Sequence, residues 1–222
     1  MHLKMSKIHN AYIKFKYKYQ QFLKRRKLRY RDLCIISNNC WAGTAVYQPF
    51  GLKYNTPTVG LFIMDDDYIE FLENLDFYLA QPLRFVPLTE SKYRDTLFKD
   101  GERSVNYPLA ILDDKVEIHF LHYKSESEAA EKWQRRKLRI NKKRLLIKWS
   151  LRYSSHTNDT NIERFLNLPF KNKVAFVPSS CKMKAPELVI IPELDTLNIV
   201  GGDETETTLK RISLIELLNS LK

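Results

Sequence analysis

Short apolar runs that alternate with amphipathic segments are the feature that most constrains how this chain folds. Three of these runs are Leu33–Ile36, Thr58–Met64 and Leu145–Trp149, and each is followed by polar or turn-forming residues. Such runs are typical of strands buried on both faces of a parallel sheet. Asp67–Leu79 and Glu126–Asn141 instead repeat apolar residues at helical spacing. Strands and helices in alternation predict a three-layer α/β fold with a largely parallel sheet.

The bulk composition fits a globular protein without a membrane span. The chain has 222 residues, of which 44% are hydrophobic, and this suffices for a full core. It has no run of about eighteen apolar residues and no apolar signal segment, so we expect neither a transmembrane helix nor secretion. Cys34, Cys40 and Cys181 stand at no metal-ligand spacing and fit the reduced thiols of a cytoplasmic protein.

The positive charge is concentrated at one end of the chain. The net charge is +11, and the first 32 residues hold eleven Lys or Arg and a single acid, Asp32. The rest of the chain holds 26 basic and 25 acidic residues and is nearly neutral. We therefore predict a basic arm over residues 1–30 and a single α/β domain over residues 31–222.

Residues 8–30 of the arm are predicted to form a basic amphipathic helix. The residues that mark its apolar face, at spacings of three and four, are Ile8, Tyr12, Phe15, Tyr19 and Phe22. The alternation from Ile13 to Tyr19 would also suit a strand, but the absence of Gly and Pro favours the helix.

Aromatic residues among lysines are typical of a helix at an anionic membrane surface, so we expect residues 8–30 to contact one. The protein would then lie at the cytoplasmic face of the membrane. The alternative is a helix packed on its own domain with a solvated basic face. A nucleic-acid partner is disfavoured, because the nearly neutral body leaves only the arm to contact phosphates.

Three polar groups directly follow predicted strands. They are Asn38-Asn39-Cys40, Asp65-Asp66-Asp67 and His122-Tyr123. The carboxyl ends of parallel strands meet at one edge of a sheet, where α/β proteins hold their ligands. We therefore expect the three groups to lie at the same edge.

Cys40 and His122 form the strongest pair for catalysis. Cys40 stands at an expected helix start, where the helix dipole lowers the pKa of a thiol. A nucleophilic thiol needs a base, here His122, and a group such as Asn39 or Asp66 to orient that base. Trp41 could cover the thiol. In the structural alternative, Cys40 is a small buried residue and His122 caps the next helix.

The aspartate cluster is the rival centre. Carboxylates after an apolar strand can hold a divalent cation, as in nucleotide-sugar glycosyltransferases. Capping of the following helix by Asp66 or Asp67 is the simpler interpretation, and we assign no metal ligands. The sequence has no phosphate-binding glycine loop and no dinucleotide fingerprint, so the cofactor stays unknown.

The end of the Glu126–Asn141 helix is strongly basic. Its arginines match the helix dipole and are explained by a solvated helix end. Arg135, Arg136 or Arg139 could also hold an anionic substrate such as a sugar phosphate.

Several segments resemble a bacterial family of unknown activity that is labelled as exopolysaccharide or capsular polysaccharide biosynthesis proteins. The likeness is carried by IISNNCWAG at Ile35–Gly43, YQPFGLKYNTPTVGLF at Tyr47–Phe62, DYIEFLENLDFYL at Asp67–Leu79, VEIHFLHYKSESEAAEKWQRRKLRIN at Val116–Asn141, and LPFKNKVAF at Leu168–Phe176. The positions that match the recurring polar and aromatic residues of the family are Asn38, Asn39, Cys40, His122, Tyr123, Trp133, Arg136 and Arg139. Asp65 and Asp66 are less typical of that pattern.

The resemblance implies a cytoplasmic role in making or decorating surface polysaccharide. Our leading prediction is a transferase, for acyl transfer or a related step, with Cys40 and His122 as nucleophile and base. Its substrate would be a carbohydrate or an activated sugar or acyl compound. The residues predicted to bind it are Asn38, Trp41, Asp66, Tyr123, Trp133, Arg136 and Arg139. The alternatives are a metal-dependent glycosyltransferase and a non-enzymatic accessory of a membrane-associated polysaccharide-synthesis complex.

Overall fold

A computed structural model describes residues 2–97, 106–151, 159–195 and 204–221 of the chain, with side chains from residue 9 onwards. Its centre is a four-stranded parallel sheet in the order β1-β5-β6-β7. The strands are β1 (Cys34–Ser37), β5 (Leu145–Ser150), β6 (Lys173–Val177) and β7 (Leu188–Ile190). The Gly201-Gly202 pair predicts a turn, and this position lies outside the described residues.

Both faces of this sheet are covered, which gives the three layers predicted from the sequence. Alternate residues of β1 point to opposite sides, because side chains alternate along a strand. Ile36 packs toward α3 (Asp65–Glu73), α4 (Leu75–Ala80), α6 (Glu126–Lys137) and α7 (Asp159–Asn167). Ile35 packs toward the π-helix η1 (Ala42–Tyr47) and the C-terminal helix α9 (Leu214–Asn219). The mixed α/β fold and the parallel sheet are thus confirmed.

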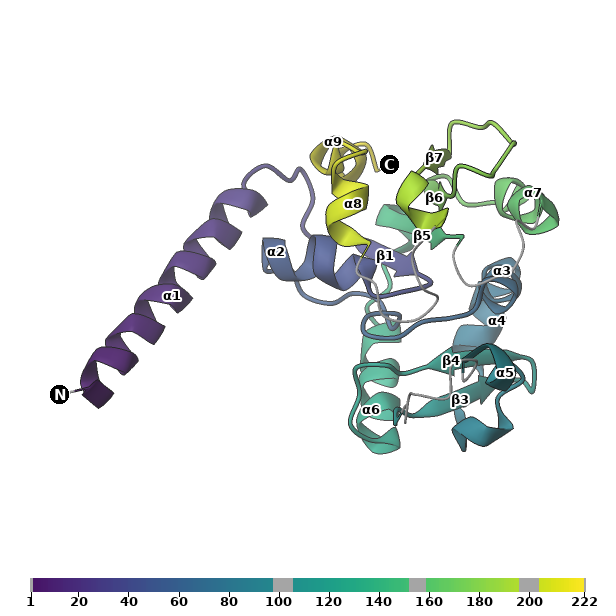
Figure 1. Cartoon of the computed structure of the whole chain (residues 1–222), viewed down its shortest axis with the longest axis horizontal. Helices are drawn as coiled ribbons and strands as arrows, with labels where there is room; N and C mark the ends of the chain where they lie inside the picture. The colour runs from purple at the N-terminus through teal and green to yellow at the C-terminus, as the bar shows by residue number, and fades with distance from the viewer. Residues whose placement is uncertain (1, 98–105, 152–158, 196–203, 222) are drawn as a thin grey trace.

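A second, antiparallel sheet extends the first face. It consists of β2 (Arg84–Val86), β3 (Leu109–Leu112) and β4 (Val116–His119), in the order β2-β3-β4. Ala110 and Ile118 on its inner face belong to the same hydrophobic core as Ile36. Figure 1 shows this sheet with α5 (Arg94–Leu97) and α6 in the lower part of the body, below the parallel sheet.

The apolar run Thr58–Met64 is not a strand of the parallel sheet, contrary to its predicted role. It passes between the two sheets and bonds to both. Ile63 N donates to the Asn38 carbonyl after β1 at 2.9 Å. Phe62 forms a two-way antiparallel bridge with His119 at the end of β4. The run is apolar because it is buried, and burial alone does not distinguish a strand from a connector.

Several predicted helices are divided or moved. The helix predicted over Asp67–Leu79 is α3 and α4, which meet at Asn74. The helical spacing of apolar residues over Thr207–Leu221 also predicts a terminal helix, and this segment is α8 (Thr205–Leu209) followed by α9. The remaining short elements are α2 (Gln48–Phe50), η2 (Leu88–Glu90), η3 (Lys142–Arg144) and η4 (Pro192–Asp195).

The basic arm contains one helix, α1 (His2–Arg25), which runs away from the body of the protein (Figure 1). Only its C-terminal half is tied to the domain by side-chain hydrogen bonds among the described residues. Gln21 donates to the Gln48 carbonyl at 2.7 Å, and Arg25 donates to the Gly51 carbonyl at 3.0 Å. No helix of the described residues is both long and apolar enough to cross a membrane.

Candidate functional site

Cys40 and His122 line the same pocket. It has a volume of about 420 Å³, within the range of small-molecule sites. It lies between the segment that follows β1 and the segment that follows β4, and Val59 and Gly60 also line it. The side chains that bring functional groups to it are Cys40, Thr44, Gln48, Tyr54, His122, Tyr123, Lys132 and Arg136.

The Thr58–Met64 connector contacts both Cys40 and His122 through the carbonyl groups of adjacent residues. The Sγ atom of Cys40 lies 3.8 Å from the Leu61 carbonyl oxygen. The backbone N–H of His122 donates to the Gly60 carbonyl at 3.0 Å. Cys40 and His122 therefore meet at this pocket although their strands belong to different sheets. The single shared sheet edge predicted from the sequence is wrong.

Gly60 is required at the floor of the pocket for two reasons. Its φ of +82° lies in the left-handed region, which side chains with a Cβ atom rarely adopt. A Cβ atom at this position would lie 3.2 Å from Cε2 of Tyr123 and 3.5 Å from Cβ of His122. The absence of a side chain thus lets the chain after β4 approach the connector closely.

Cys40 precedes an irregular helix. The Asn39 side chain accepts a hydrogen bond from Trp41 N at 3.1 Å, and the Cys40 carbonyl accepts one from Gly43 N at 2.9 Å. The following residues form the π-helix η1, a geometry that occurs frequently at functional sites. Cys40 is half-buried, whereas Cys34 is buried and its thiol pKa is raised by burial to about 12.

Arg136 is the buried cation of the pocket. It lies on α6, whose start is capped by Ser125: the Ser125 hydroxyl accepts from Glu128 N at 3.2 Å. The Arg136 side chain is 7% exposed and lies against the faces of Tyr54 and Tyr123, with Cζ 4.9 and 5.9 Å from the ring centroids. Its Nη1 donates to the Val59 carbonyl at 3.1 Å and to the Tyr123 hydroxyl at 2.6 Å.

Arg136 has no carboxylate partner among the described residues, and no described Asp or Glu lines the pocket. The second lining cation, Lys132, pairs with Glu128 and lies 5.3 Å from the Tyr123 ring centroid. A buried charge without a counter-ion is costly unless a ligand supplies one. The pocket is therefore suited to a negatively charged ligand.

Tyr123 fixes the position of Arg136. Its hydroxyl donates to the Val59 carbonyl at 2.6 Å while it accepts from Arg136. Burial raises the pKa of Tyr123, and Arg136 lowers it by a smaller amount, so the hydroxyl is protonated at neutral pH. The guanidinium is held by two neutral oxygens, and no Asp or Glu of the described residues compensates its positive charge.

Asn38 and Asn39 are buried at the end of β1 and do not line the pocket. Asn38 bridges to β5: its Nδ2 donates to the Ser150 carbonyl at 2.9 Å, and its Oδ1 accepts from Ser150 N at 3.0 Å. Asn39 donates to Glu204 at 3.0 Å and accepts from Lys148 at 3.0 Å. Their contacts join strands and helices, so the catalytic role predicted for Asn39 has no support in this geometry.

Lys148 and Glu204 form a buried ion pair that the sequence did not reveal. Lys148 is fully buried on β5, and Glu204 is buried just before α8. Burial raises the pKa of Glu204, but Lys148 and the hydrogen bonds from Ser150 and Asn39 together lower it by more, so the pKa lies below its usual value. The Ser150 hydroxyl donates to the same carboxylate at 2.6 Å. The pair links the start of α8 to β5 of the parallel sheet.

The aspartate cluster does not converge. Asp65 accepts from the Trp149 indole at 2.8 Å, and Asp67 binds Lys92 and the N–H of Glu117. Asp66 is exposed on α3. Within the described residues, no group of three His, Cys, Asp or Glu side chains could hold a metal ion.

The two tryptophans and Arg139 also lie outside the pocket lining. Trp41 is buried and donates to the Thr208 hydroxyl at 2.8 Å. Trp133 is fully buried in the core beside Phe71 and Phe120. Arg139 is half-buried. Tyr54 and Lys132 line the pocket instead and were missed. Lys132 stands four residues before Arg136, and this helical spacing could have revealed it.

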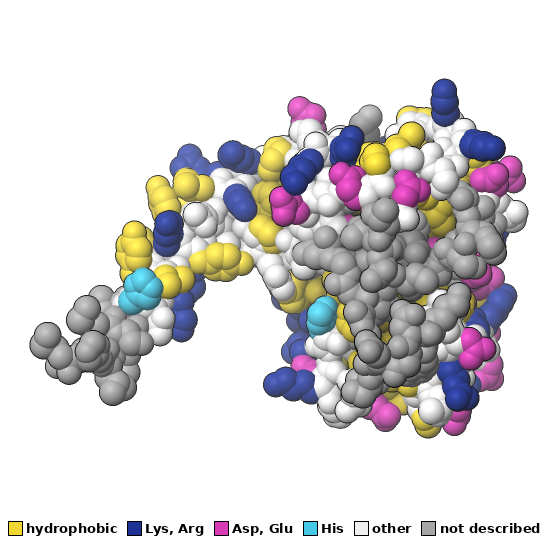
Figure 2. Space-filling model, in the orientation of Figure 1, with side chains coloured by type: hydrophobic (Ala, Val, Ile, Leu, Met, Phe, Trp, Pro, Cys, Tyr) yellow, Lys and Arg dark blue, Asp and Glu magenta, His cyan; other side chains and the backbone are white. Residues whose placement is uncertain are grey.

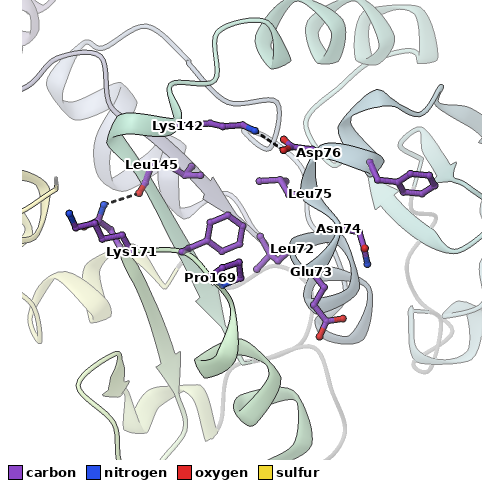
Figure 3. A pocket seen from close by; sticks show the side chains of 12 residues that line it. Leu72, Glu73, Asn74, Leu75, Asp76, Lys142, Leu145, Pro169 and Lys171 are labelled. Atoms are coloured by element: carbon purple, nitrogen blue, oxygen red, sulfur yellow. Dashed lines mark hydrogen bonds and ion pairs between the residues drawn. The ribbon is translucent and has the colours of Figure 1, made fainter.

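A cavity of about 470 Å³ lies at the opposite end of the parallel sheet, where β5 begins (Figure 3). Its walls are mainly apolar and include Leu72, Leu75 and Pro169. At its rim Lys142 bonds Asp76 at 2.6 Å and Glu73 bonds Arg164 at 2.7 Å, and Lys171 is exposed to solvent rather than buried. We therefore place the functional site at the Cys40 pocket.

Comparison with known proteins points to a family without an assigned activity. A family model described as "Domain of unknown function (DUF1919)" matches residues 11–210. An "Uncharacterized protein" of Haemophilus influenzae is 38% identical over 152 residues. This match covers 68% of the chain and 65% of the relative, which is just under two thirds of the relative's length. A bacterial family of unknown activity is thus confirmed, and the link to polysaccharide synthesis stays a prediction.

The buried ion pair yields a stability prediction. Glu204→Gln removes the carboxylate that pairs with the buried Lys148 ammonium and should lower the free energy of unfolding by about 3–5 kcal/mol. The double variant Lys148→Met/Glu204→Leu should recover most of that loss. Because the pKa of Glu204 is lowered on folding, its contribution is present above the usual glutamate pKa of 4.5 and is lost as the pH falls further. Urea unfolding of the variants at several pH values measures both effects, and a stable Glu204→Gln protein would contradict them.

Proposed function

This chain belongs to the DUF1919 family, and we propose that it is a cysteine-dependent transferase that acts on a negatively charged substrate. One observation carries the proposal: Cys40, His122 and Arg136 line the same pocket. A thiol and an imidazole are the groups that nucleophilic catalysis by cysteine requires. A buried arginine without a carboxylate partner favours a substrate that carries an anionic group.

The proposed reaction is an acyl transfer through a thioester. His122 takes the proton of the Cys40 thiol, and the thiolate attacks the carbonyl carbon of an activated acyl donor. A carbon–sulfur bond forms, the bond to the leaving group breaks, and the leaving group receives the proton from His122. A hydroxyl of the acceptor then attacks the thioester and gives its proton to His122. The Cys40 sulfur leaves and regains that proton.

The other lining residues suit a polar substrate. Arg136 and Lys132 bind its anionic group, a phosphoryl or carboxylate group, and Arg136 can do so with two parallel hydrogen bonds. The side chains of Thr44 and Gln48 carry donors and acceptors that match sugar hydroxyl groups. An activated sugar or acyl donor meets these requirements.

We propose that this transfer contributes to capsule or exopolysaccharide assembly in the cytoplasm. The support comes from the location of the polysaccharide-family motifs in this chain. Ile35–Gly43 contributes Cys40 to the pocket, and Val116–Asn141 contributes His122, Lys132 and Arg136. The segments that carry the resemblance are therefore the segments that build the site.

The alternatives rest on weaker observations. A glycosyltransferase that uses Asp65–Asp67 and a divalent cation gains no support, because these carboxylates point to different partners. A non-enzymatic accessory of a membrane-associated complex would use α1 but would leave the pocket unexplained.

The catalytic pair is tested by the alkylation rate of each cysteine. At neutral pH, iodoacetamide should modify Cys40 much faster than the buried Cys34 and Cys181, as measured by peptide mass spectrometry. Only the thiolate reacts, so His122→Gln should slow the modification of Cys40 several-fold. The effect should disappear at high pH, where the thiolate forms without a base.

His9→Gln, on the exposed arm, is the matched control and should leave the rate unchanged. Equal rates for His122→Gln and the unaltered protein at neutral pH would refute the pairing of Cys40 with His122.

The anion site is tested with inorganic phosphate. Phosphate bound at Arg136 should protect Cys40 from iodoacetamide, whereas sodium chloride at equal ionic strength should not. Arg136→Gln should abolish the protection because the buried charge is lost. Arg135→Gln is the matched control, since Arg135 is exposed on the same helix and paired with Glu131 at 3.0 Å. Protection that persists in Arg136→Gln would place the anion elsewhere.

The biological role is tested in cells that lack this gene. Complementation with the unaltered chain should restore the composition of the surface polysaccharide, and Cys40→Ala should not. Cys181→Ala should complement normally, because Cys181 is outside the pocket lining. Normal polysaccharide with Cys40→Ala at equal protein level would eliminate the proposed role of Cys40 as nucleophile.

A further inference from the structure

The helix α1 presents its polar face to the domain and its apolar face away from it. The side chains that bond the domain are Tyr17, Gln21 and Arg25, which follow one another at intervals of four residues. Tyr17 donates to the Gln48 carbonyl at 3.2 Å, Gln21 donates to the same carbonyl at 2.7 Å, and Arg25 donates to the Gly51 carbonyl at 3.0 Å. The apolar face of α1 is therefore not the face that bonds the domain.

The opposite side of α1 carries an aromatic stripe, which we define as Tyr12, Phe15, Tyr19, Phe22 and Leu23. At 3.6 residues per turn, the stripe lies roughly 150° around the helix from the domain-facing side chains. Its residues are 62%, 69%, 53%, 46% and 42% exposed, in chain order. Figure 2 shows hydrophobic side chains standing among lysines and arginines along the projecting arm. Exposed apolar surface of this kind marks an interaction site.

Cations border the stripe on both sides. On a helical projection Lys16 falls at one border and Lys18 at the other. Arg26 extends the stripe at its C-terminal end, with Cζ 5.8 Å from the Phe22 ring centroid. The first acidic residue of the chain is Asp32, after the helix. The occupant of this face must combine apolar surface with negative charge.

We propose that α1 lies in the interface of an anionic phospholipid bilayer. The aromatic stripe enters the boundary between headgroups and acyl chains, and Lys16 and Lys18 reach the lipid phosphates. The helix is too polar to cross a bilayer, and it spans about 36 Å when it lies along the surface.

Other occupants fit this face less well. In a second copy of the chain, α1 carries the same cations, so pairing two stripes would bring lysines against lysines. A nucleic acid would engage the basic borders of the helix and leave the stripe in water. Only the membrane surface uses both features of the face.

The attachment of α1 also orients the body. The Gln48 carbonyl accepts hydrogen bonds from Tyr17 and Gln21, and Gln48 lines the Cys40 pocket. Because the domain is bonded to the face opposite the stripe, the body stays on the aqueous side of the membrane. The arm thereby sets the distance of the pocket from the lipid surface.

Co-sedimentation of the full chain with vesicles tests the proposal. The protein should pellet with vesicles of phosphatidylcholine and phosphatidylglycerol at low salt, and much less with phosphatidylcholine alone. Lys16→Gln or Lys18→Gln should each weaken binding to the anionic vesicles about fivefold. Phe15→Ser/Tyr19→Ser should weaken it at least about tenfold, because it removes buried apolar area.

Tyr17→Ser is the matched control, since it removes an aromatic side chain from the domain-facing side of the same helix, and it should bind anionic vesicles as before. Thermal unfolding should be unchanged in the stripe variant, because these side chains are outside the core. The proposal is overturned if the unaltered chain stays in the supernatant, or if the stripe variant binds vesicles equally well. It is also overturned if binding is equal without anionic lipid, or if Phe15→Ser/Tyr19→Ser instead dissociates a dimer or a complex with duplex DNA.

Discussion

The connector from Gly60 to Ile63 is the constraint on which the site depends. It bonds to the end of β1 through Ile63 and to the end of β4 through Phe62, so it joins the parallel and the antiparallel sheets. Its carbonyl groups at Gly60 and Leu61 face the chain that carries His122 and the side chain of Cys40, respectively. The pocket exists because a single extended segment is shared by both sheets. The left-handed conformation of Gly60 lets the segment that carries His122 come close enough to the connector to form the pocket.

Two buried cations, Lys148 and Arg136, differ in the groups that bind them. Lys148 is fully neutralised by Glu204 and bonded to neighbouring side chains, so its role is to hold the C-terminal helices on the sheet. Arg136 is almost as deeply buried but is held by the Val59 carbonyl and the Tyr123 hydroxyl, which are neutral. The first arrangement has its counter-ion within the protein, whereas the described residues supply none for the second. This difference distinguishes a structural ion pair from the proposed anion site.

The arm and the pocket both contact the short helix α2. The backbone of the short α2 helix receives the hydrogen bonds of α1, and its first residue, Gln48, also lines the pocket. A helix that contacts a membrane through its aromatic stripe would hold the domain by its polar face. The proposed transferase would thereby work at a defined height above the lipid surface.

Local patterns in the sequence determined much of this protein: the alternation of strands and helices, the parallel sheet, and the choice of Cys40 and His122 as candidate site residues. These features depend on neighbours within a few positions, where periodicity and capping are visible. The tertiary structure alone decided that Thr58–Met64 connects two sheets, that Asn39 pairs with Glu204 and Lys148, and that no described carboxylate pairs with Arg136. It also decided that α1 turns its aromatic stripe away from the domain. Burial makes a strand and a connector equally apolar, so the sequence did not distinguish them. Contacts between distant segments leave no periodic pattern in the chain, so the sequence did not predict the other outcomes.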